Sequence, residues 1–210
     1  MIFSKPIIPS IVFDFNDATS IVIAALMTVA AVAAAVITAG YAAEKYKSNR
    51  NKTTAVFALV TLAVSVCANL FYGATPTAVK GIVLTLVLLF ASAADLKTKE
   101  CPDYLHVMVL ITAFIGVNLE SIPYMTLSAF FAGGVMLLTL LLTKSDVGGA
   151  DIKMATAASF VLGMTRGTAG LVAGMLLAIL FNISKEARKK GFPMIPYLAA
   201  GYVAAFFIQV

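Results

Sequence analysis

The apolar course of this chain is broken at one point by the polar stretch Lys144-Ser145-Asp146-Val147-Gly148-Gly149-Ala150-Asp151-Ile152-Lys153. Two glycines and four charged side chains stand together here between two apolar runs. An acidic side chain costs about 2.5–3.5 kcal/mol at the centre of a bilayer, so an acid at such a place indicates a functional site. A second acid, Asp95, ends another apolar run in the same way. We therefore expect Asp95 and Asp151 to form a site at one face of a membrane.

The composition is that of an integral membrane protein. Of the 210 residues, 61% are apolar and 12% are charged, whereas soluble domains are about 45–50% apolar and about 25% charged. Apolar runs of helix length follow one another along the chain, and they lack the alternation of apolar and polar residues that is typical of membrane barrels. The sequence therefore predicts an all-α polytopic membrane protein without a separate soluble domain.

About eight transmembrane helices are predicted from these runs and the polar breaks between them. The predicted spans are 20–43, 53–72, 79–96, 104–119, 124–143, 151–164, 167–184 and 192–210. The fourth and the sixth are short for a hydrocarbon layer of about 30 Å. The predicted division has three parts: a short extracytoplasmic N-terminus (1–19), two N-terminal transmembrane helices (20–78) and a six-helix core (79–210).

Basic residues predict which side of the membrane each loop faces. With alternating spans, one side receives the loops 44–52, 97–103, 144–153 and 184–191, which hold 12 of the 15 Lys and Arg residues. By the positive-inside rule these loops are cytoplasmic and both termini lie outside. The net charge of +5 then reports orientation in the cell membrane and contact with anionic lipid headgroups, and no nucleic-acid partner is expected.

Two acids on the same predicted side suggest a specific chemistry. Carboxylates held close together do not easily both ionise, so they share a proton. One of them can take a proton from water while the other protonates a carbonyl oxygen, as in aspartic peptide hydrolysis. This chemistry needs no cofactor and no metal, and Cys67 and Cys101 lack the spacing of a metal site. Composition alone leaves one alternative open, which is that both acids only cap helices at the membrane surface.

The glycine-bearing stretch resembles the GxGD motif of type IV prepilin and preflagellin peptidases, which are membrane aspartyl proteases. That family usually reads Gly-x-Gly-Asp-x-Lys, followed by an apolar helix of small residues that ends in Gly. The segment Gly148-Gly149-Ala150-Asp151-Ile152-Lys153 continues to Gly163 in this way, and departs from the pattern at Ala150. The family's other aspartate motif is similar to the run from Asp95 to Pro102-Asp103-Tyr104-Leu105. The start of its last helix resembles Gly191-Phe192-Pro193-Met194-Ile195-Pro196.

The resemblance covers about 79–210 and implies a specific activity. Such enzymes remove the short basic leader peptide from pilin-like or flagellin-like (archaellin-like) precursors at the cytoplasmic edge of the membrane, for pilus assembly or protein secretion. Asp95 and Asp151 would be the catalytic pair. Larger members also methylate the new N-terminus and carry a cysteine-paired loop near their beginning. This chain has no such cysteines, so it resembles the short, peptidase-only branch, and N-methyltransferase activity is not expected.

Further residues near the two acids are expected to contact the substrate. Gly148, Gly149 and Ala150 form a turn that would let an extended backbone approach Asp151. The remaining candidates are charged or lie near the last helix: Lys153, Glu100, Asp103, Asp146, Pro193 and Pro196. The acids among them would meet a basic leader peptide, and Asp103 is alternatively a first-turn helix acid. His106 is interpreted as a packed or interfacial residue, and the GxxxG pair Gly170 and Gly174 indicates close helix packing.

Two other classes of protein stay open as alternatives. Relatives of signal-peptide peptidase and presenilin share GxGD and cut inside the bilayer, but they carry Tyr before the first acid, where this chain has Ala94. A cation-coupled transporter would place its acids near the midplane and build its fold from repeated halves. Here the acids stand at the ends of predicted spans, and the sequence contains no apparent repeat.

Overall fold

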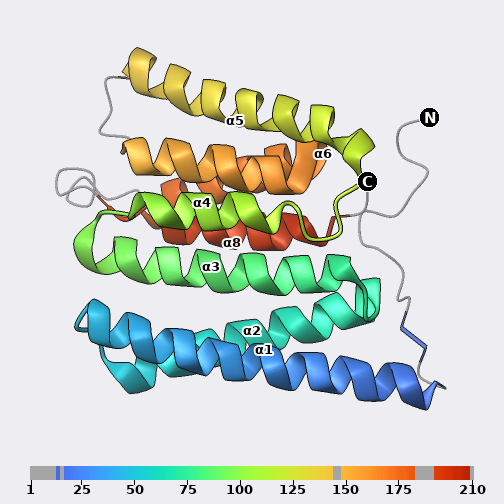
Figure 1. The fold of residues 1–210 in the computed structure, drawn as a ribbon. Coiled ribbons are helices and arrows are strands. Elements are labelled where there is room, and N and C mark those ends of the chain that lie inside the picture. Colours follow the sequence, from blue (N-terminus) through green and yellow to red (C-terminus); the bar gives the residue numbers. More distant parts are fainter. Residues whose placement is uncertain (1–12, 15–16, 144–147, 183–191, 209–210) are drawn as a thin grey trace.

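The computed structural model describes residues 13–14, 17–143, 148–182 and 192–208, which form an all-α bundle. Seven α-helices run side by side along one direction (Figure 1). They are α1 (Ala18–Lys45), α2 (Arg50–Tyr72), α3 (Pro76–Thr98), α4 (Asp103–Thr112), α5 (Ile122–Thr143), α6 (Gly149–Phe181) and α8 (Ile195–Phe206), and a 3₁₀ turn at Leu119–Ser121 precedes α5. Five helical stretches are long and apolar enough to cross a membrane: Ala18–Lys45, Arg50–Tyr72, Pro76–Thr98, Leu119–Leu142 and Gly149–Phe181. The chain is a multi-pass membrane protein.

The predicted count of eight spans is wrong, because the described residues give seven α-helices and five helices of spanning length. Two of the predicted spans correspond to short helices, since α4 has 10 residues and α8 has 12. The predicted span 151–164 and most of the predicted span 167–184 fall within the single element α6. The predicted fourth span, 104–119, stops early because α4 ends at Thr112 and Gly116 adopts a left-handed φ of 58°.

Within α6 the chain turns back at Gly163. This residue has φ 75° and ψ −177°, a backbone conformation that glycine adopts without the Cβ clash of other residues. A Cβ placed on Gly167 would lie 3.0 Å from the Ser159 Cα, whereas residues eight apart in a straight helix are about 12 Å apart. Ser128 of α5 donates a hydrogen bond to the Gly163 carbonyl at 2.9 Å. The boundary predicted between 164 and 167 is therefore a tight reversal, and the two halves of α6 pack against each other.

The starts of the long helices follow from polar capping residues. Asp17 accepts hydrogen bonds from two backbone N–H groups in the first turn of α1. Asn49 does the same for one N–H of α2, and Thr75 caps α3 just before Pro76. Such side chains satisfy N–H groups that have no partner within the helix, and Pro suits the first helical position. These local signals explain why the first three helices begin within a few residues of the predicted spans.

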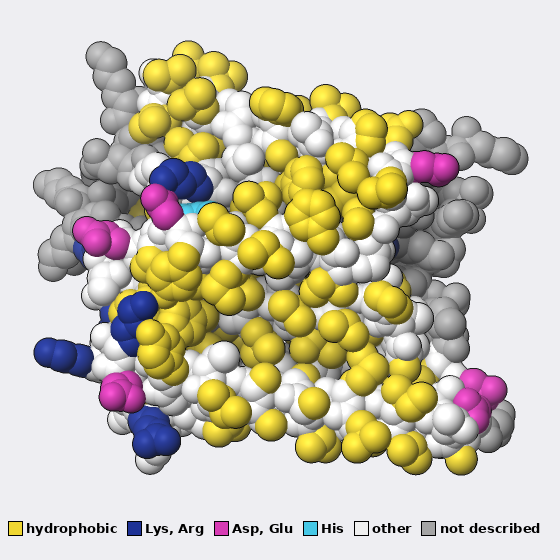
Figure 2. All heavy atoms as spheres, viewed as in Figure 1, with side chains coloured by type: hydrophobic (Ala, Val, Ile, Leu, Met, Phe, Trp, Pro, Cys, Tyr) yellow, Lys and Arg dark blue, Asp and Glu magenta, His cyan; other side chains and the backbone are white. Residues whose placement is uncertain are grey.

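The helix order brings the basic loops to one end of the bundle. At this end α1, α3 and α5 finish and α2, α4, α6 and α8 begin (Figure 1). Figure 2 shows most of the visible Lys and Arg side chains gathered there, while hydrophobic side chains cover much of the visible face between the two ends. We call it the basic end. The described loops that were predicted to share one side of the membrane therefore do share one end of the molecule.

Helix α3 lies at the centre of the bundle. In α3, 56% of the most apolar 18-residue stretch is buried. The corresponding share is 17% in α1 and 22% in the stretch that contains α5. Leu84 and Leu88 of α3 are fully buried, together with Met154 of α6 and Leu198 of α8. Because apolar side chains surround α3, a buried acid on this helix needs a hydrogen-bond partner from a neighbouring helix.

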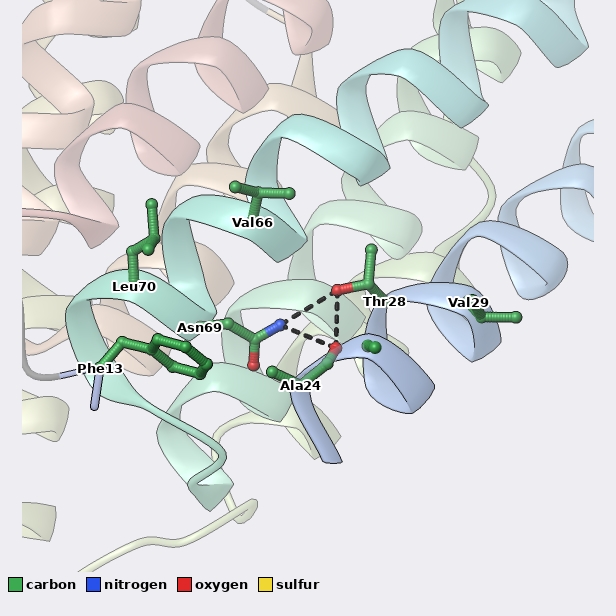
Figure 3. A pocket seen from close by; sticks show the side chains of 8 residues that line it. Phe13, Ala24, Thr28, Val29, Val66, Asn69 and Leu70 are labelled. Atoms are coloured by element: carbon green, nitrogen blue, oxygen red, sulfur yellow. Dashed lines mark hydrogen bonds between the residues drawn. The ribbon is translucent and has the colours of Figure 1, made fainter. Parts of the chain in front are cut away.

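The helices α1 and α2 form a pair that is joined to the rest at both ends. At the basic end Lys45 of α1 donates a hydrogen bond to the Tyr104 hydroxyl of α4 at 2.9 Å. At the opposite end Tyr72 of α2 donates to the Phe206 carbonyl of α8 at 2.7 Å. Between the two helices, the Asn69 amide donates to Thr28 at 3.1 Å beside an apolar pocket of about 350 Å³ (Figure 3).

Candidate active site

Asp95 lies on the last turn of α3 and is buried, with 5% of its surface exposed. Its Oδ2 accepts a hydrogen bond from the backbone N–H of Ile195 at 2.9 Å. Ile195 is the first residue of α8, and the residue before it offers no side-chain cap. Asp95 therefore satisfies a free N–H group at the positive end of the α8 dipole, although it stands at the end of its own helix.

Asp151 lies in the first turn of α6 and is half-buried. Its Oδ2 accepts a hydrogen bond from the Gly148 N–H at 3.2 Å, which closes the turn before the helix. Each of the two acids thus receives a backbone N–H at the start of a helix. The Asp151 carboxyl lies close enough to Asp95 for the charge of Asp95 to influence it. The two acids that the sequence singled out are brought within electrostatic reach of each other at the basic end.

Cys101 lies beside both acids, in the loop between α3 and α4. Its side chain is buried, with 8% exposed. Burial and, after it, the negative charges of Asp95, Asp151 and Asp103 raise the pKa of the Cys101 thiol to about 12. Spacing rules for metals and disulfides did not single out this cysteine, because its place near the acids depends on the path of the loop between α3 and α4.

The Cys101 thiol provides a direct test of this geometry. Only the thiolate reacts with a small reagent such as methyl methanethiosulfonate, so the labelling rate at fixed pH follows the thiol pKa. We expect Asp95→Asn and Asp151→Asn each to raise the Cys101 labelling rate by at least about three-fold, because each removes a nearby negative charge. The rate is measured by mass spectrometry, with Cys67 as the internal reference. Unchanged Cys101 rates in both variants would contradict the placement of the two acids.

Two contacts join the first turn of α4 to the first turn of α6. Lys153 Nζ lies 2.7 Å from Asp103 Oδ1, and this hydrogen bond holds the pKa of the Asp103 carboxyl below its ordinary value. His106 is buried, and its Nε2 lies 3.0 Å from the Ala150 carbonyl oxygen. Asp103 is thus a first-turn helix acid with a partner inside the chain. His106 is packed, as interpreted, but it contacts the residue that precedes Asp151.

The other predicted substrate contacts are placed as follows. Gly148 and Gly149 are exposed, and a Cβ on Gly149 would meet nothing within 4 Å. A Cβ on Gly148 would lie 3.1 Å from Asp151 Oδ2, so a side chain there would crowd the carboxylate. Glu100 is exposed in the loop after α3. Pro193 and Pro196 are half-buried around the start of α8, next to the amide that binds Asp95.

Two further predictions concern what the site holds. Asp146 lies outside the described residues. Within the part of the chain that the structure describes, no group of three or more His, Cys, Asp or Glu is arranged to hold a metal ion.

The fold and the site define a class: a multi-pass helical membrane protein that joins two acids at its basic end. Residues 82–183 match the model of the type IV leader peptidase family. A curated relative, the prepilin leader peptidase/N-methyltransferase of Bacillus subtilis, is 23% identical over 161 residues, which cover 70% of this chain and 63% of the relative. No solved structure matches the chain. The matched segment, which contains Asp95 and Asp151, is thus similar to the type IV leader peptidase family, and the resemblance is confirmed for the two aspartate motifs.

Proposed function

We propose that this protein is a membrane aspartic endopeptidase that removes the basic leader peptide from type IV pilin-like or archaellin-like precursors. The proposed site of cleavage is the cytoplasmic face of the membrane, where the basic end would lie. The observation that carries the proposal is the pairing of Asp95 and Asp151 within the segment that matches the family. The chain spans only 63% of the length of its relative. The proposed activity therefore rests on this site and not on the relative's name.

In the proposed reaction one carboxyl of the pair is ionised and the other keeps a proton. The ionised member takes a proton from a water molecule, whose oxygen attacks the scissile carbonyl carbon, while the protonated member gives its proton to the carbonyl oxygen. Collapse of the tetrahedral intermediate breaks the C–N bond, and the amine leaves with a proton from the pair. Oδ2 of each acid accepts a backbone N–H, from Ile195 for Asp95 and from Gly148 for Asp151, and these bonds would orient the two carboxyl groups for this chemistry.

The substrate contacts in this proposal follow from the surroundings of the pair. An extended precursor backbone would pass over the exposed Gly148 and Gly149 next to Asp151. Glu100 and Asp146 would attract the positive charges of the leader. Asp103 is engaged with Lys153, so this ion pair would border the substrate, and Pro193 and Pro196 would shape the opposite border at the start of α8.

We further propose that cleavage proceeds without methylation of the new N-terminus. Cys67 lies within α2 and Cys101 in the loop after α3, and the connection between α1 and α2 is only a few residues long. This supports a peptidase without a cysteine-paired loop. Mass spectrometry of the processed precursor, after incubation with S-adenosylmethionine, tests the point: an added methyl group would contradict it.

Co-expression with a precursor that carries a basic leader tests the proposed function. Wild-type protein is expected to shorten the precursor at the end of the leader, which N-terminal sequencing locates. Asp95→Asn and Asp151→Asn are expected to leave the precursor intact. Glu44→Gln is the matched control, because Glu44 is an exposed acid at the same end of the bundle, on α1. Cleavage by both Asp variants would overturn the proposal.

The same variants separate the two alternatives. A protease of the signal-peptide-peptidase class would cut within the apolar segment of the precursor, so the sequenced N-terminus would lie several residues further along. A cation-coupled transporter would show an ion flux in proteoliposomes that depends on both acids, with no cleavage. Neither result is expected from acids that lie at helix ends near the basic loops.

A further inference from the structure

His106 lies on the first turn of α4 and reaches across to the start of α6. Its exposed fraction is 5%. The Nε2 atom lies 3.0 Å from the carbonyl oxygen of Ala150. A carbonyl oxygen only accepts hydrogen bonds, so Nε2 must carry the proton and donate it. This contact fixes the tautomer and the orientation of the imidazole ring, and it ties α4 to the residue directly before Asp151.

The His106 contact differs in kind from the neighbouring ion pair. Asp103 and Lys153 are paired at 2.7 Å, but their side chains are 78% and 57% exposed. Exposed ion pairs contribute little to holding a structure in place. The His106 bond is shielded from water, and the imidazole is stiffer than a lysine chain. The other ring nitrogen, Nδ1, lies 3.8 Å from Asp103 Oδ1, beyond hydrogen-bond distance. The buried bond is therefore the contact that sets how α6 begins relative to α4.

The bond reaches Asp151 through very little intervening chain. Ala150 and Asp151 are consecutive residues in the first turn of α6, so a rotation of that turn moves the Asp151 carboxylate directly. Asp95 cannot follow such a movement, because its carboxylate is bound to the start of α8. Any shift of the first turn would change the separation of the two acids. The site thus depends on an outside contact that holds this turn.

We propose that His106 is a positioning residue, which holds Asp151 in line with Asp95 by donating a hydrogen bond from Nε2 to the Ala150 carbonyl. The inference rests on the proposed function, since positioning has a purpose only if the two acids react together. Ala150 is the position at which the motif departs from the family pattern. In this proposal its backbone carbonyl accepts the hydrogen bond of His106, and its side chain takes no part.

Three variants test the proposal. His106→Gln keeps an N–H donor near the position of Nε2, whereas His106→Leu keeps much of the bulk and removes both nitrogens. Thr112→Val is the control: Thr112 is also buried on α4, and its hydroxyl donates a hydrogen bond to the Val109 carbonyl of the same helix, at 2.6 Å. We expect Leu to lower kcat by about 10- to 100-fold with KM within about two-fold, because small misplacements of reacting groups are costly. The Gln and Val variants are expected to stay within about three-fold of wild type.

The amount of folded enzyme is measured by gel filtration in detergent, and cleavage rates are divided by this amount. Labelling of Cys101 is a second measurement, which does not depend on activity. In His106→Leu the labelling rate is expected to rise toward that of Asp151→Asn, as the carboxylate moves away from the thiol. Equal losses of kcat in the Leu and Gln variants would overturn the proposal, as would wild-type kcat and labelling in the Leu variant. If Asp151→Asn still cleaves, the proposed function fails, and the labelling rates alone decide whether His106 holds Asp151.

Discussion

Replacing Asp95 or Asp151 by Asn is expected to lower the rate of leader-peptide cleavage by at least about 10³-fold, with a double variant no slower than either single one. The amide neither takes a proton from water nor gives one to the carbonyl oxygen. Because the two acids would act as one unit on one water molecule, losing either member removes the whole proton relay. Groups that act together show this non-additive behaviour, whereas independent groups multiply their effects.

The measurement is a single-turnover cleavage assay in detergent micelles, with enzyme in excess over a purified precursor. Asn at position 95 can still accept the Ile195 N–H through its amide oxygen, so α8 keeps its cap. Asp95→Ala leaves this N–H buried and unpaired, at a cost of about 1–3 kcal/mol in stability. Both variants should be inactive and only the Ala variant should melt earlier. A double variant slowed by the product of the two single effects would contradict a shared dyad.

The positions of the long helices could be read from the sequence because their limits are set locally. Asp17, Asn49 and Thr75 cap the first three helices, and these polar residues interrupt apolar runs in the sequence itself. The number of spans could not be read in the same way. The turn at Gly163 needs no polar loop, because a left-handed glycine and one hydroxyl from α5 complete it. The short α4 likewise ends at Thr112 inside an apolar run, and the chain turns at Gly116 with a left-handed φ.

The acids of the candidate site were predictable and their partners were not. Asp95 and Asp151 are conspicuous because an acid in an apolar chain is costly unless it has a use. The amide that binds Asp95 comes from a residue 100 positions later, and only the packing of α8 against α3 brings it there. The same holds for Lys153, which occupies Asp103 from 50 positions away, and for the contact of His106 with Ala150. Such pairings are set by helix packing, which leaves no local pattern.

The contact of Gly201 with α6 carries the second large prediction. A Cβ on Gly201 of α8 would overlap the Gly170 carbonyl oxygen and the Gly174 nitrogen, both on α6. These are backbone atoms, so no side-chain rotation relieves the clash. The GxxxG spacing of Gly170 and Gly174 therefore forms a helix contact within the chain, as predicted from the sequence. A side chain at Gly201 must push α8 away from α6.

Gly201→Ala is expected to destabilise the protein by about 3 kcal/mol, the upper part of the usual range for overpacking. Gly134→Ala is the matched control: Gly134 lies in α5, and a Cβ there would meet nothing within 4 Å, while Ala gains about 1 kcal/mol over Gly in a helix interior. Thermal unfolding in detergent compares the two. Since the first residue of α8 binds Asp95, displacement of α8 should also slow cleavage in the protein that remains folded, whereas Gly134→Ala should cleave at the wild-type rate. Equal melting temperatures would mean that α6 and α8 do not approach each other closely at Gly201. The proposal that the packing of α8 holds Asp95 in place would then be contradicted as well.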